Sequence, residues 1–550
     1  MIFLRSVSTP ALYSLNFSQI IGHRRFPLVF FSGLLFLFLI HNSHISLWEQ
    51  DEGAYAGFAR RMLQTGDWLI PDYFWSFIHR KTPLHFWNIA ISYSVFGENN
   101  FALRLSSALS VWLVYLSIYR FGSFLAGEIE IRISLLVLAS SYLINFLAKM
   151  AVTDGTLLFF NTMAALALAR HVNGRGSIKN TVFLWTSIAL ALLVKGPPVL
   201  IFIGFFAFLL LVFHPGRKLL FLLHPWVFLP LALLPLYFWG KAAWDRDGGI
   251  FIGWLLDWYV LKRFSQGFFG QTAPPGAYFL LISIAFLPFL YLQPRMWKFA
   301  WRESLRKDSA TLTLLLWFVA AWFPFEWSPS KLPAYTAAAH VPFALLLGKF
   351  LSRDLLTNEA STALYRVQLI FQALIIAAIP VAGIILHLSP VFRFSSVFCA
   401  TGLLLLIVKQ LRDNQIQLRR LFALNAGFSV FIWLVVYGQI DPVKNIPEQI
   451  GEFLKGKYIN AVIGNNHGHP PGLFVYTERN AGKAELMTNT DTLRILATEY
   501  ENTAFILSAE QWSGIRSVPG MHLDTVICGQ LTDRKEKACY FIASRRNKTP

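Results

Sequence analysis

Repeated runs of about 20 apolar residues constrain the fold of this chain more than any other feature, because a helix of that length crosses the hydrocarbon core of a bilayer. Of the 550 residues, 55% are hydrophobic and only 14% are charged, whereas soluble domains carry about 25% charged residues. The mean hydropathy is +0.49. These values indicate a polytopic membrane protein. They exclude an ordinary soluble enzyme, a coiled coil, a disordered chain and a disulfide scaffold.

The apolar runs predict thirteen membrane-spanning helices. The expected ranges are 27–47, 100–124, 131–147, 153–170, 179–195, 197–213, 221–239, 275–292, 308–326, 332–351, 364–388, 393–410 and 418–439. The first run is too long for the core of a removable signal peptide and lacks a small-residue cleavage site.

The distribution of positive charge supports this number of spans, because Lys and Arg gather in cytoplasmic loops. With a cytoplasmic N-terminus, every inside connection is basic, and the short outside connections carry few cations, namely Lys149, Lys195 and Lys331. A missed span would invert every later loop and break the pattern. The net charge of +18 therefore reflects membrane topology, and we expect no nucleic-acid partner.

Three outside segments are long: residues 48–99, 240–274 and 441–550. We expect residues 1–440 to form the transmembrane domain and the tail to form one small α/β domain. In the tail the sequence predicts a helix at Thr492–Tyr500 and strand-like runs at Tyr458–Gly464, Leu473–Tyr476, Ala504–Leu507, Thr525–Cys528 and Ala538–Ala543. Three cysteines are too few for a disulfide framework. For Cys528 and Cys539, which flank an expected turn, a disulfide and a reduced pair both stay open.

Ionisable and aromatic polar residues converge on the outer membrane boundary. They are Asp51, Glu52, Arg80, Lys81, Asp154, Lys195, Lys262, Arg263, Lys331 and Tyr335. Charged groups at membrane depth are costly and mark functional sites. Cations neutralise a phosphate, and a carboxylate accepts a proton from an attacking hydroxyl. The combination indicates a site for a lipid-linked phosphate, with the lipid tail among the apolar spans.

Each of these residues also has a structural explanation when it is taken alone. Asp51 and Glu52 would cap an amphipathic helix at Gly53–Leu63. The lysines would be anchors that reach the interface, and Asp154 would pair with one of them. Arg263 would lie in an interfacial amphipathic segment. The joint arrangement, rather than any single residue, favours a site.

Five motifs make the sequence resemble a known superfamily. They are Trp48-Glu49-Gln50-Asp51-Glu52-Gly53-Ala54-Tyr55, Lys81-Thr82-Pro83-Leu84-His85, Thr153-Asp154-Gly155, Val194-Lys195-Gly196-Pro197 and Ser330-Lys331-Leu332-Pro333-Ala334-Tyr335. With these motifs in this order along the chain, the sequence resembles the aminoarabinose transferase and protein mannosyltransferase superfamily. Its members are membrane glycosyltransferases of the GT-C class, which use sugars carried on polyprenyl phosphate. Thirteen spans and a C-terminal α/β domain look most like the bacterial lipid A aminoarabinose transferases.

The resemblance implies an all-α polytopic GT-C domain with a small periplasmic α/β domain in a bacterial inner membrane. It implies an inverting transfer from undecaprenyl phosphate to a lipid A or other glycan acceptor, by a monomer. The implied catalytic residues are Asp51 and Asp154. The implied substrate-binding residues are Tyr55, Arg80, Lys81, Lys195, Arg263, Lys331 and Tyr335.

Two departures from the family pattern concern a metal. Where relatives have Glu-Lys-Pro-Pro, this chain has Arg80-Lys81-Thr82-Pro83, and a Glu-Glu-His stretch is replaced by Asp257-Trp258-Tyr259-Val260. A metal between those positions would lose both ligands, which leaves Asp51 and Asp154 as the residues that would hold a divalent ion. We predict no required metal or cofactor.

Two other functions were weighed against this one. A protein hydroxyl is an alternative acceptor, as in protein O-mannosyltransferases, and nothing in the sequence excludes it. A flippase for lipid-linked sugars would predict inverted repeats and helices broken at mid-membrane, and the sequence shows neither.

Overall fold

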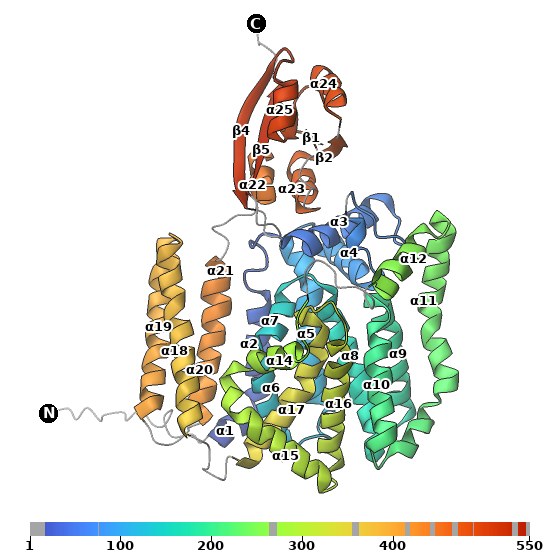
Figure 1. Ribbon diagram of the computed structural model, residues 1–550, viewed down its shortest axis with the longest axis vertical. Helices are drawn as coiled ribbons and strands as arrows, with labels where there is room; N and C mark the ends of the chain where they lie inside the picture. Colours follow the sequence, from blue (N-terminus) through green and yellow to red (C-terminus); the bar gives the residue numbers. More distant parts are fainter. Residues whose placement is uncertain are drawn as a thin grey trace, which may run out of the picture.

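The structure, a computed structural model, describes residues 17–74, 76–262, 272–354, 362–412, 418–439, 446–464, 471–487, 489–530 and 537–545. A large bundle of helices carries a small α/β unit above one of its ends (Figure 1). The bundle helices are α1 (Phe17–Gly22), α2 (Phe26–Leu39), α5 (Asn100–Phe121), α6 (Glu128–Ala139), α7 (Tyr142–Lys149), α8 (Thr153–Arg170), α9 (Ile178–Lys195), α10 (Pro198–Phe213), α11 (Pro225–Asp247), α14 (Ala277–Ala285), α15 (Gln293–Leu305), α16 (Ser309–Glu326), α17 (Ala337–Asp354), α18 (Thr362–Ile385), α19 (Pro390–Arg412), α20 (Leu418–Val430) and α21 (Tyr437–Gln439).

Within the described residues, eight helices are long and apolar enough to cross a membrane, and two bent helix pairs raise this number to ten. The pair α6 and α7 bends by 68°, and the pair Ala277–Ala285 with Leu287–Leu305 bends by 104°. Helices α2 and α10 are shorter but apolar. Each predicted span overlaps one of these elements or α8. The polytopic all-helical architecture is therefore confirmed, and the number thirteen stays a prediction.

Small residues allow the central helices to approach closely, as is common where lipid removes the hydrophobic driving force between helices. Helix α17 is the most buried of the candidate spans, with 89% of its apolar window inside the protein. A Cβ added to Gly348 on α17 would overlap the Ser134 hydroxyl on α6. This contact places α17 at the centre of the bundle.

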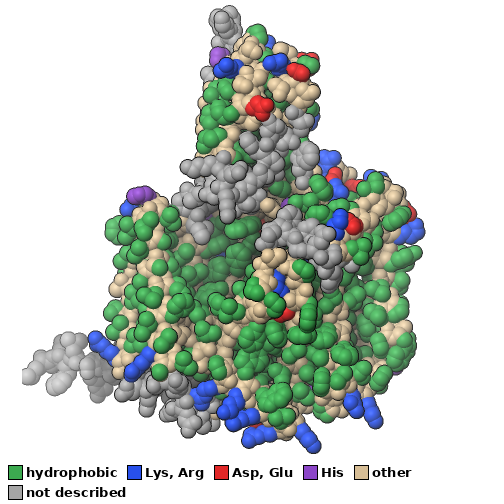
Figure 2. All heavy atoms as spheres, viewed as in Figure 1, with side chains coloured by type: hydrophobic (Ala, Val, Ile, Leu, Met, Phe, Trp, Pro, Cys, Tyr) green, Lys and Arg blue, Asp and Glu red, His purple; other side chains and the backbone are tan. Residues whose placement is uncertain are grey.

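Positive side chains gather at the end of the bundle opposite the α/β unit (Figure 2). Helix α15 lies at that end (Figure 1) and carries Arg295, Lys298 and Arg302. The alternation of basic and less basic loops along the sequence thus corresponds to a concentration of positive charge at one end of the folded molecule.

The elements of the two outer segments lie at the other end of the bundle, with α3 and α4 beneath the α/β unit and α12 to one side of it, near α11 (Figure 1). The first segment forms α3 (Glu49–Thr65), the short helix η1 (Phe77–His79) and α4 (Leu84–Phe96). The second forms α12 (Ile250–Leu255) and η4 (Leu256–Lys262).

The α/β unit contains a five-stranded sheet of order β2-β1-β3-β5-β4. Strand β1 is parallel to β2 and β3, and β5 is antiparallel to β3 and β4. The elements are α22 (Ile446–Leu454), β1 (Asn460–Gly464), α23 (Pro471–Ala481), β2 (Lys483–Met487), α24 (Thr490–Glu499), β3 (Thr503–Leu507), α25 (Ala509–Ile515), β4 (Met521–Gln530) and β5 (Lys537–Arg545).

Four of the five predicted strand-like runs coincide with strands, but the run Leu473–Tyr476 is wrong because it lies inside helix α23. All four of its residues are buried, and a short, wholly apolar run does not distinguish a buried strand from a buried helix. Strand β2 was not predicted. The predicted helix at Thr492–Tyr500 corresponds to α24.

Helix α23 docks the α/β unit on the first outer segment. A Cβ added to Gly53 on α3 would lie 2.5 Å from the backbone nitrogen of Gly472, so the two helices touch through their backbones. Beside this contact, Arg479 Nε lies 3.0 Å from Glu98 Oε1, and Arg60 Nε lies 2.9 Å from Glu478 Oε2. The charges of the two arginines and the two glutamates compensate each other in this mostly buried interface. This compensation limits the free-energy cost of removing the four groups from water.

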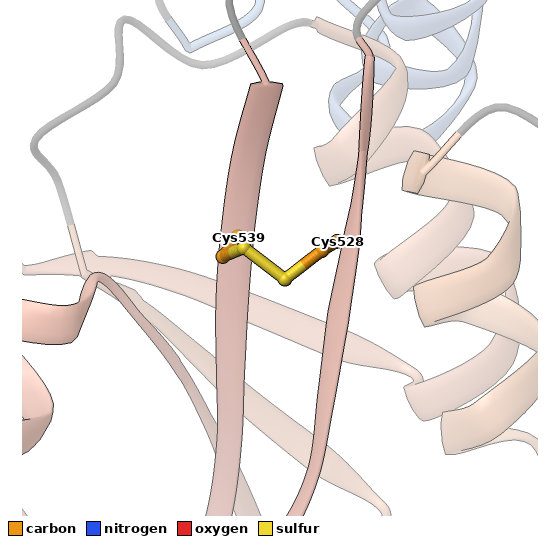
Figure 3. Close-up of a disulfide and its surroundings, with 2 residues drawn as sticks. All are labelled: Cys528 and Cys539. Carbon is orange, nitrogen blue, oxygen red and sulfur yellow. A yellow bond between two sulfur atoms is a disulfide. The ribbon is translucent and has the colours of Figure 1, made fainter.

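Cys528 and Cys539 face each other on β4 and β5 and form a disulfide (Figure 3). The pair cross-links the edge hairpin of the sheet, so the structure favours the oxidised state of the two left open by the sequence. The remaining cysteine, Cys399 on α19, is free.

We expect the number of reactive thiols to distinguish the two disulfide-bonded cysteines from the free Cys399. Because disulfides persist outside the reducing cytoplasm, the denatured, unreduced protein should react with one maleimide at Cys399, and the reduced protein with three. Gel shifts with a polymer-linked maleimide measure both numbers. Three reactive thiols before reduction would contradict the disulfide, and Cys528→Ser should raise the unreduced count to two.

Candidate functional site

The adjacent acids Asp51 and Glu52, at the start of α3, have different surroundings. Glu52 is fully buried and accepts hydrogen bonds from Arg104 Nε at 2.9 Å and Nη2 at 2.6 Å. It also accepts from the backbone nitrogens of Trp48 at 2.8 Å and Ala151 at 2.7 Å. Glu52 therefore joins α3 to α5 and to the chain just before α8. The capping explanation placed both acids before a helix at Gly53, but α3 begins at Glu49, so Asp51 and Glu52 lie within its first turn.

The Asp51 side chain is 42% exposed and faces two basic residues of the same outer segment. Its Oδ1 lies 3.1 Å from His79 Nδ1 and 3.9 Å from Lys81 Nζ. Lys81 also donates to the Tyr55 hydroxyl, and Tyr55 lies one helical turn after Asp51 on the same face of α3. Desolvation of the Asp51 carboxyl group disfavours its charged form. The positive charge of Lys81, followed by the hydrogen bond from His79, has the larger and opposite effect. Together, Lys81 and His79 hold the pKa of Asp51 well below its usual range.

His85, at the start of α4, completes this cluster beneath Lys81. It is fully buried, and its Nδ1 lies 3.3 Å from the Thr156 hydroxyl on α8. Burial, followed by the charge of nearby Lys81, lowers the pKa of His85 to about 4. The imidazole is therefore neutral at physiological pH.

A second charged pair lies where α8 and α9 meet the outer boundary. Lys195 Nζ donates to Asp154 Oδ1 at 2.7 Å and to Oδ2 at 2.8 Å, which is the pairing that the structural explanation of Asp154 expected. The same ammonium lies 5.2 Å from the centre of the Tyr335 ring. Lys195 is near enough to lower the pKa of Asp51, so the two clusters form one electrostatic site.

An apolar cavity of about 120 Å³ begins at this pair. Asp154, Lys195, Tyr335 and Asn161 provide polar lining, and the other walls come mostly from apolar residues of α8, α10, α16 and α17. The arrangement is amphipathic, with charge at the outer end and hydrocarbon below it.

Two other predicted residues lie in different contacts. Arg80 pairs with Asp72, and its guanidinium lies 5.9 Å from the centre of the Phe251 ring on α12. It thereby connects the two outer segments. The contacts give no support for a direct role in substrate binding, which stays a prediction.

Lys331 holds the chain near α14. Its Nζ donates to the carbonyl of Glu326 at 2.7 Å and lies 5.0 Å from the centre of the Tyr278 ring. The Glu326 carboxylate accepts from backbone nitrogens at the start of α14. A substrate contact of Lys331 stays a prediction, and Arg263 lies outside the described residues.

Sequence reasoning missed His79 and Glu326 as parts of this region. His79 immediately precedes Arg80 and Lys81, and this short basic run was the available signal. Glu326 accepts from backbone nitrogens 47 to 50 residues earlier in the chain, which no local sequence pattern identifies. Across the ranges that the structure describes, no three His, Cys, Asp or Glu side chains gather closely enough to hold a metal ion.

Comparisons with known proteins agree with this architecture. A family model described as dolichyl-phosphate-mannose-protein mannosyltransferase matches residues 80–244. An undecaprenyl phosphate-alpha-4-amino-4-deoxy-L-arabinose arabinosyl transferase of Pseudomonas fluorescens is 26% identical over 430 residues, covering 74% of this chain and 70% of that protein. Its counterpart in Pseudomonas aeruginosa is 30% identical over 335 residues, which span 58% of each chain.

Solved structures show the same fold. The crystal structure of ArnT from Cupriavidus metallidurans bound to undecaprenyl phosphate has a TM-score of 0.71 and 18% identity, and it covers 94% of this chain and 97% of that one. The apo form of the same protein gives a TM-score of 0.70.

The fold and these similarities together indicate a polytopic membrane glycosyltransferase. The chain is similar to the aminoarabinose transferases over most of its length, and residues 80–244 match the protein mannosyltransferase family model.

We expect Glu52→Gln to destabilise the fold strongly, because it leaves Arg104 buried without its counter-charge. Removing one partner of a buried ion pair costs about 3–5 kcal/mol of unfolding free energy. Glu128→Gln is the matched control, since Glu128 pairs with Arg132 but its side chain is 69% exposed; exposed pairs contribute about 0–1 kcal/mol. Thermal unfolding in detergent measures the stability of both variants. Equal losses of unfolding free energy in the two variants would contradict the role given to Glu52.

His85 should make the protein less stable in mild acid. Its pKa is about 4 in the folded state against 6.5 when unfolded, so the unfolded chain binds the extra proton as the pH falls below 6.5. The loss reaches about 2 kcal/mol at pH 5. Relative to His85→Asn, the unfolding free energy of the wild type should fall by this amount between pH 7 and pH 5. An unchanged difference would contradict a buried neutral imidazole.

Proposed function

We propose that this protein transfers a sugar from undecaprenyl phosphate to lipid A or another envelope glycan at the periplasmic face of a bacterial inner membrane. The observation that carries the proposal is the pair of lysines, Lys81 beside Asp51 and Lys195 beside Asp154. Of these residues, Lys195 and Asp154 line the charged end of an apolar cavity. Each lysine is matched by a carboxylate before any substrate binds.

The cavity and its charged end suit the two parts of a lipid-linked donor. The carrier phosphate would lie between Lys81 and Lys195, and the first isoprenoid units would lie against the apolar walls formed by Leu157, Ile201 and Phe202. The undecaprenyl phosphate-dependent activity for which the two Pseudomonas relatives are named, and the ArnT structure bound to undecaprenyl phosphate, support this choice of donor.

The chemistry is a single displacement at the anomeric carbon. The acceptor oxygen forms a bond to that carbon, and the bond from the carbon to the carrier phosphate oxygen breaks, which inverts the configuration. Asp51 takes the proton of an acceptor hydroxyl or orients an acceptor phosphate. Lys81 and Lys195 stabilise the negative charge that develops on the leaving phosphate.

Donor binding would also prepare Asp51 for this role. Lys81 lowers the pKa of Asp51 in the free enzyme, and a carboxylate with so low a pKa is a weak base. A phosphate beside Lys81 would neutralise that influence, because like charges raise the pKa of a carboxylate. Asp154 would act through Lys195, which it holds by both carboxylate oxygens.

Two features support the proposed orientation. Lys and Arg gather at the end of the bundle opposite the α/β unit (Figure 2), which favours that end as cytoplasmic. The Cys528–Cys539 disulfide favours an oxidising compartment for the α/β unit. We further propose that residues 441–550 are a separate periplasmic domain and that the enzyme acts as a monomer.

Asp51→Asn tests the proposed chemistry. We expect transfer to fall by at least about 100-fold, as removal of a general base does, because the amide takes no proton. The matched control is Asp245→Asn, which changes an exposed carboxylate paired with Lys241 at the outer end of α11. Mass spectrometry of lipid A and total envelope glycolipids, from cells that carry each form of the gene, measures the sugar and the acceptor together.

Three outcomes decide this experiment. Loss of the modified lipid in Asp51→Asn, but not in Asp245→Asn, supports the proposal. Normal modification by folded Asp51→Asn would remove Asp51 from its role. An unchanged lipid A profile on deletion of the wild-type gene, in cells that make the donor, would contradict the acceptor and favour a protein hydroxyl or another glycan.

A further inference from the structure

A second cavity, of about 170 Å³, lies among α2, the bent pair α6–α7 and α20. It shares no lining residue with the cavity beside Asp154. Most of its walls are apolar, but Asn145, Asn425 and Trp433 also line it. These three residues are only 3%, 5% and 6% exposed.

Four buried polar atoms of residues that line this cavity have no hydrogen-bond partner within the described part of the chain. They are Asn145 Oδ1, Asn425 Oδ1, Asn425 Nδ2 and Trp433 Nε1. The Ser140 hydroxyl, which also belongs to the lining, donates to the Val137 carbonyl. The orientation of the Asn145 amide is fixed, because its Nδ2 donates to the Ala139 carbonyl at 2.7 Å. An unsatisfied buried polar group costs free energy, and the hydrocarbon region provides no bulk water to satisfy it.

The cavity opens to the surroundings of α2 at Gly33, which lines it and is exposed. A Cβ added to Gly33 would meet no atom within 4 Å. Helix α2 is one of the shorter apolar helices of the bundle, so we expect lipid as the neighbouring medium at Gly33.

The unpartnered atoms define the chemistry of an occupant. The two amide oxygens require a hydrogen-bond donor, and the two N–H groups require an acceptor. An ester carbonyl accepts only, whereas a hydroxyl group both donates and accepts. The cavity lining contains no Lys or Arg, so it does not suit a charged headgroup.

We propose that this cavity binds a membrane lipid through a hydroxylated acyl chain, with the chain hydroxyl among Asn145, Asn425 and Trp433. The apolar walls contributed by Phe30, Leu34 and Phe38 cover the hydrocarbon on both sides of that hydroxyl. The site is separate from the proposed transfer reaction and does not depend on it.

Lipid competition on the full-length protein tests this site. The probes are a phosphatidylethanolamine with one hydroxymyristoyl chain and dimyristoyl phosphatidylethanolamine, offered together to purified protein and counted by native mass spectrometry. We expect the wild type to prefer the hydroxylated lipid by about tenfold, the contribution of one or two hydrogen bonds. Asn425→Leu should abolish the preference.

Two glycine variants separate occupancy of the cavity from loss of fold. Gly33→Leu keeps every polar atom but fills the cavity, and it should reduce binding of both lipids. Gly402→Leu is the matched control, since Gly402 on α19 is exposed, lies outside the cavity and also has no atom within 4 Å of an added Cβ; it should bind as the wild type does. If Asn425→Leu fails to fold, binding of the two lipids to Gly33→Leu still tests the proposal.

Either of two results would overturn the proposal. One is a wild type without preference for the hydroxylated lipid, which would indicate that water fills the cavity. The other is a variant that behaves as the wild type does, either Asn425→Leu by keeping the preference or Gly33→Leu by binding both lipids undiminished.

Discussion

The buried ion pair between Glu52 and Arg104 is the interaction on which the site depends. Arg104 holds Glu52 by two hydrogen bonds and donates its remaining N–H groups to the carbonyls of Asn42, Ile45 and Ser46. Glu52 in turn accepts from Ala151. One pair thus fixes the chain after α2, the start of α3 and the approach to α8. Because every donor and acceptor is used, the cost of burying both charges is offset locally.

This framework determines where the reactive residues lie. Asp51 directly precedes Glu52, so fixing one carboxylate inside the protein directs the other toward His79 and Lys81. Asp154 follows Ala151 by three residues and meets Lys195 at the top of α9. A structural pair therefore positions the two charged pairs of the proposed site, near enough for Lys195 to lower the pKa of Asp51.

Charge balance in the free protein also explains how a phosphate would be accepted. Lys81 and Lys195 are each compensated by an aspartate, so the site is stable without a ligand. A carrier phosphate would add negative charge near both lysines and compete with those aspartates. The competition would strengthen Asp51 as a base at the moment when the donor is present, which couples donor binding to catalysis.

Much of this arrangement could be predicted from the sequence, and the exceptions have physical causes. The spans followed from apolar length, and the proximity of Asp51, Lys81, Asp154 and Lys195 followed from motifs of a resembling family. The different surroundings of Asp51 and Glu52 could not be predicted. They depend on the ion pair that Glu52 forms with Arg104, which lies 52 residues away in the chain. Arg80 contacts Asp72 and an aromatic ring on α12, and its role in substrate binding stays a prediction.

Binding of undecaprenyl phosphate without its sugar tests the central claim most directly. If Lys81 holds the phosphate beside Asp51, Lys81→Met should weaken binding by about tenfold or more, the value of a charge-assisted hydrogen bond. Asp51→Asn should bind the carrier at least as tightly as the wild type, because it removes a repelling negative charge. Unchanged affinity in Lys81→Met, or weaker binding in Asp51→Asn, would contradict the account.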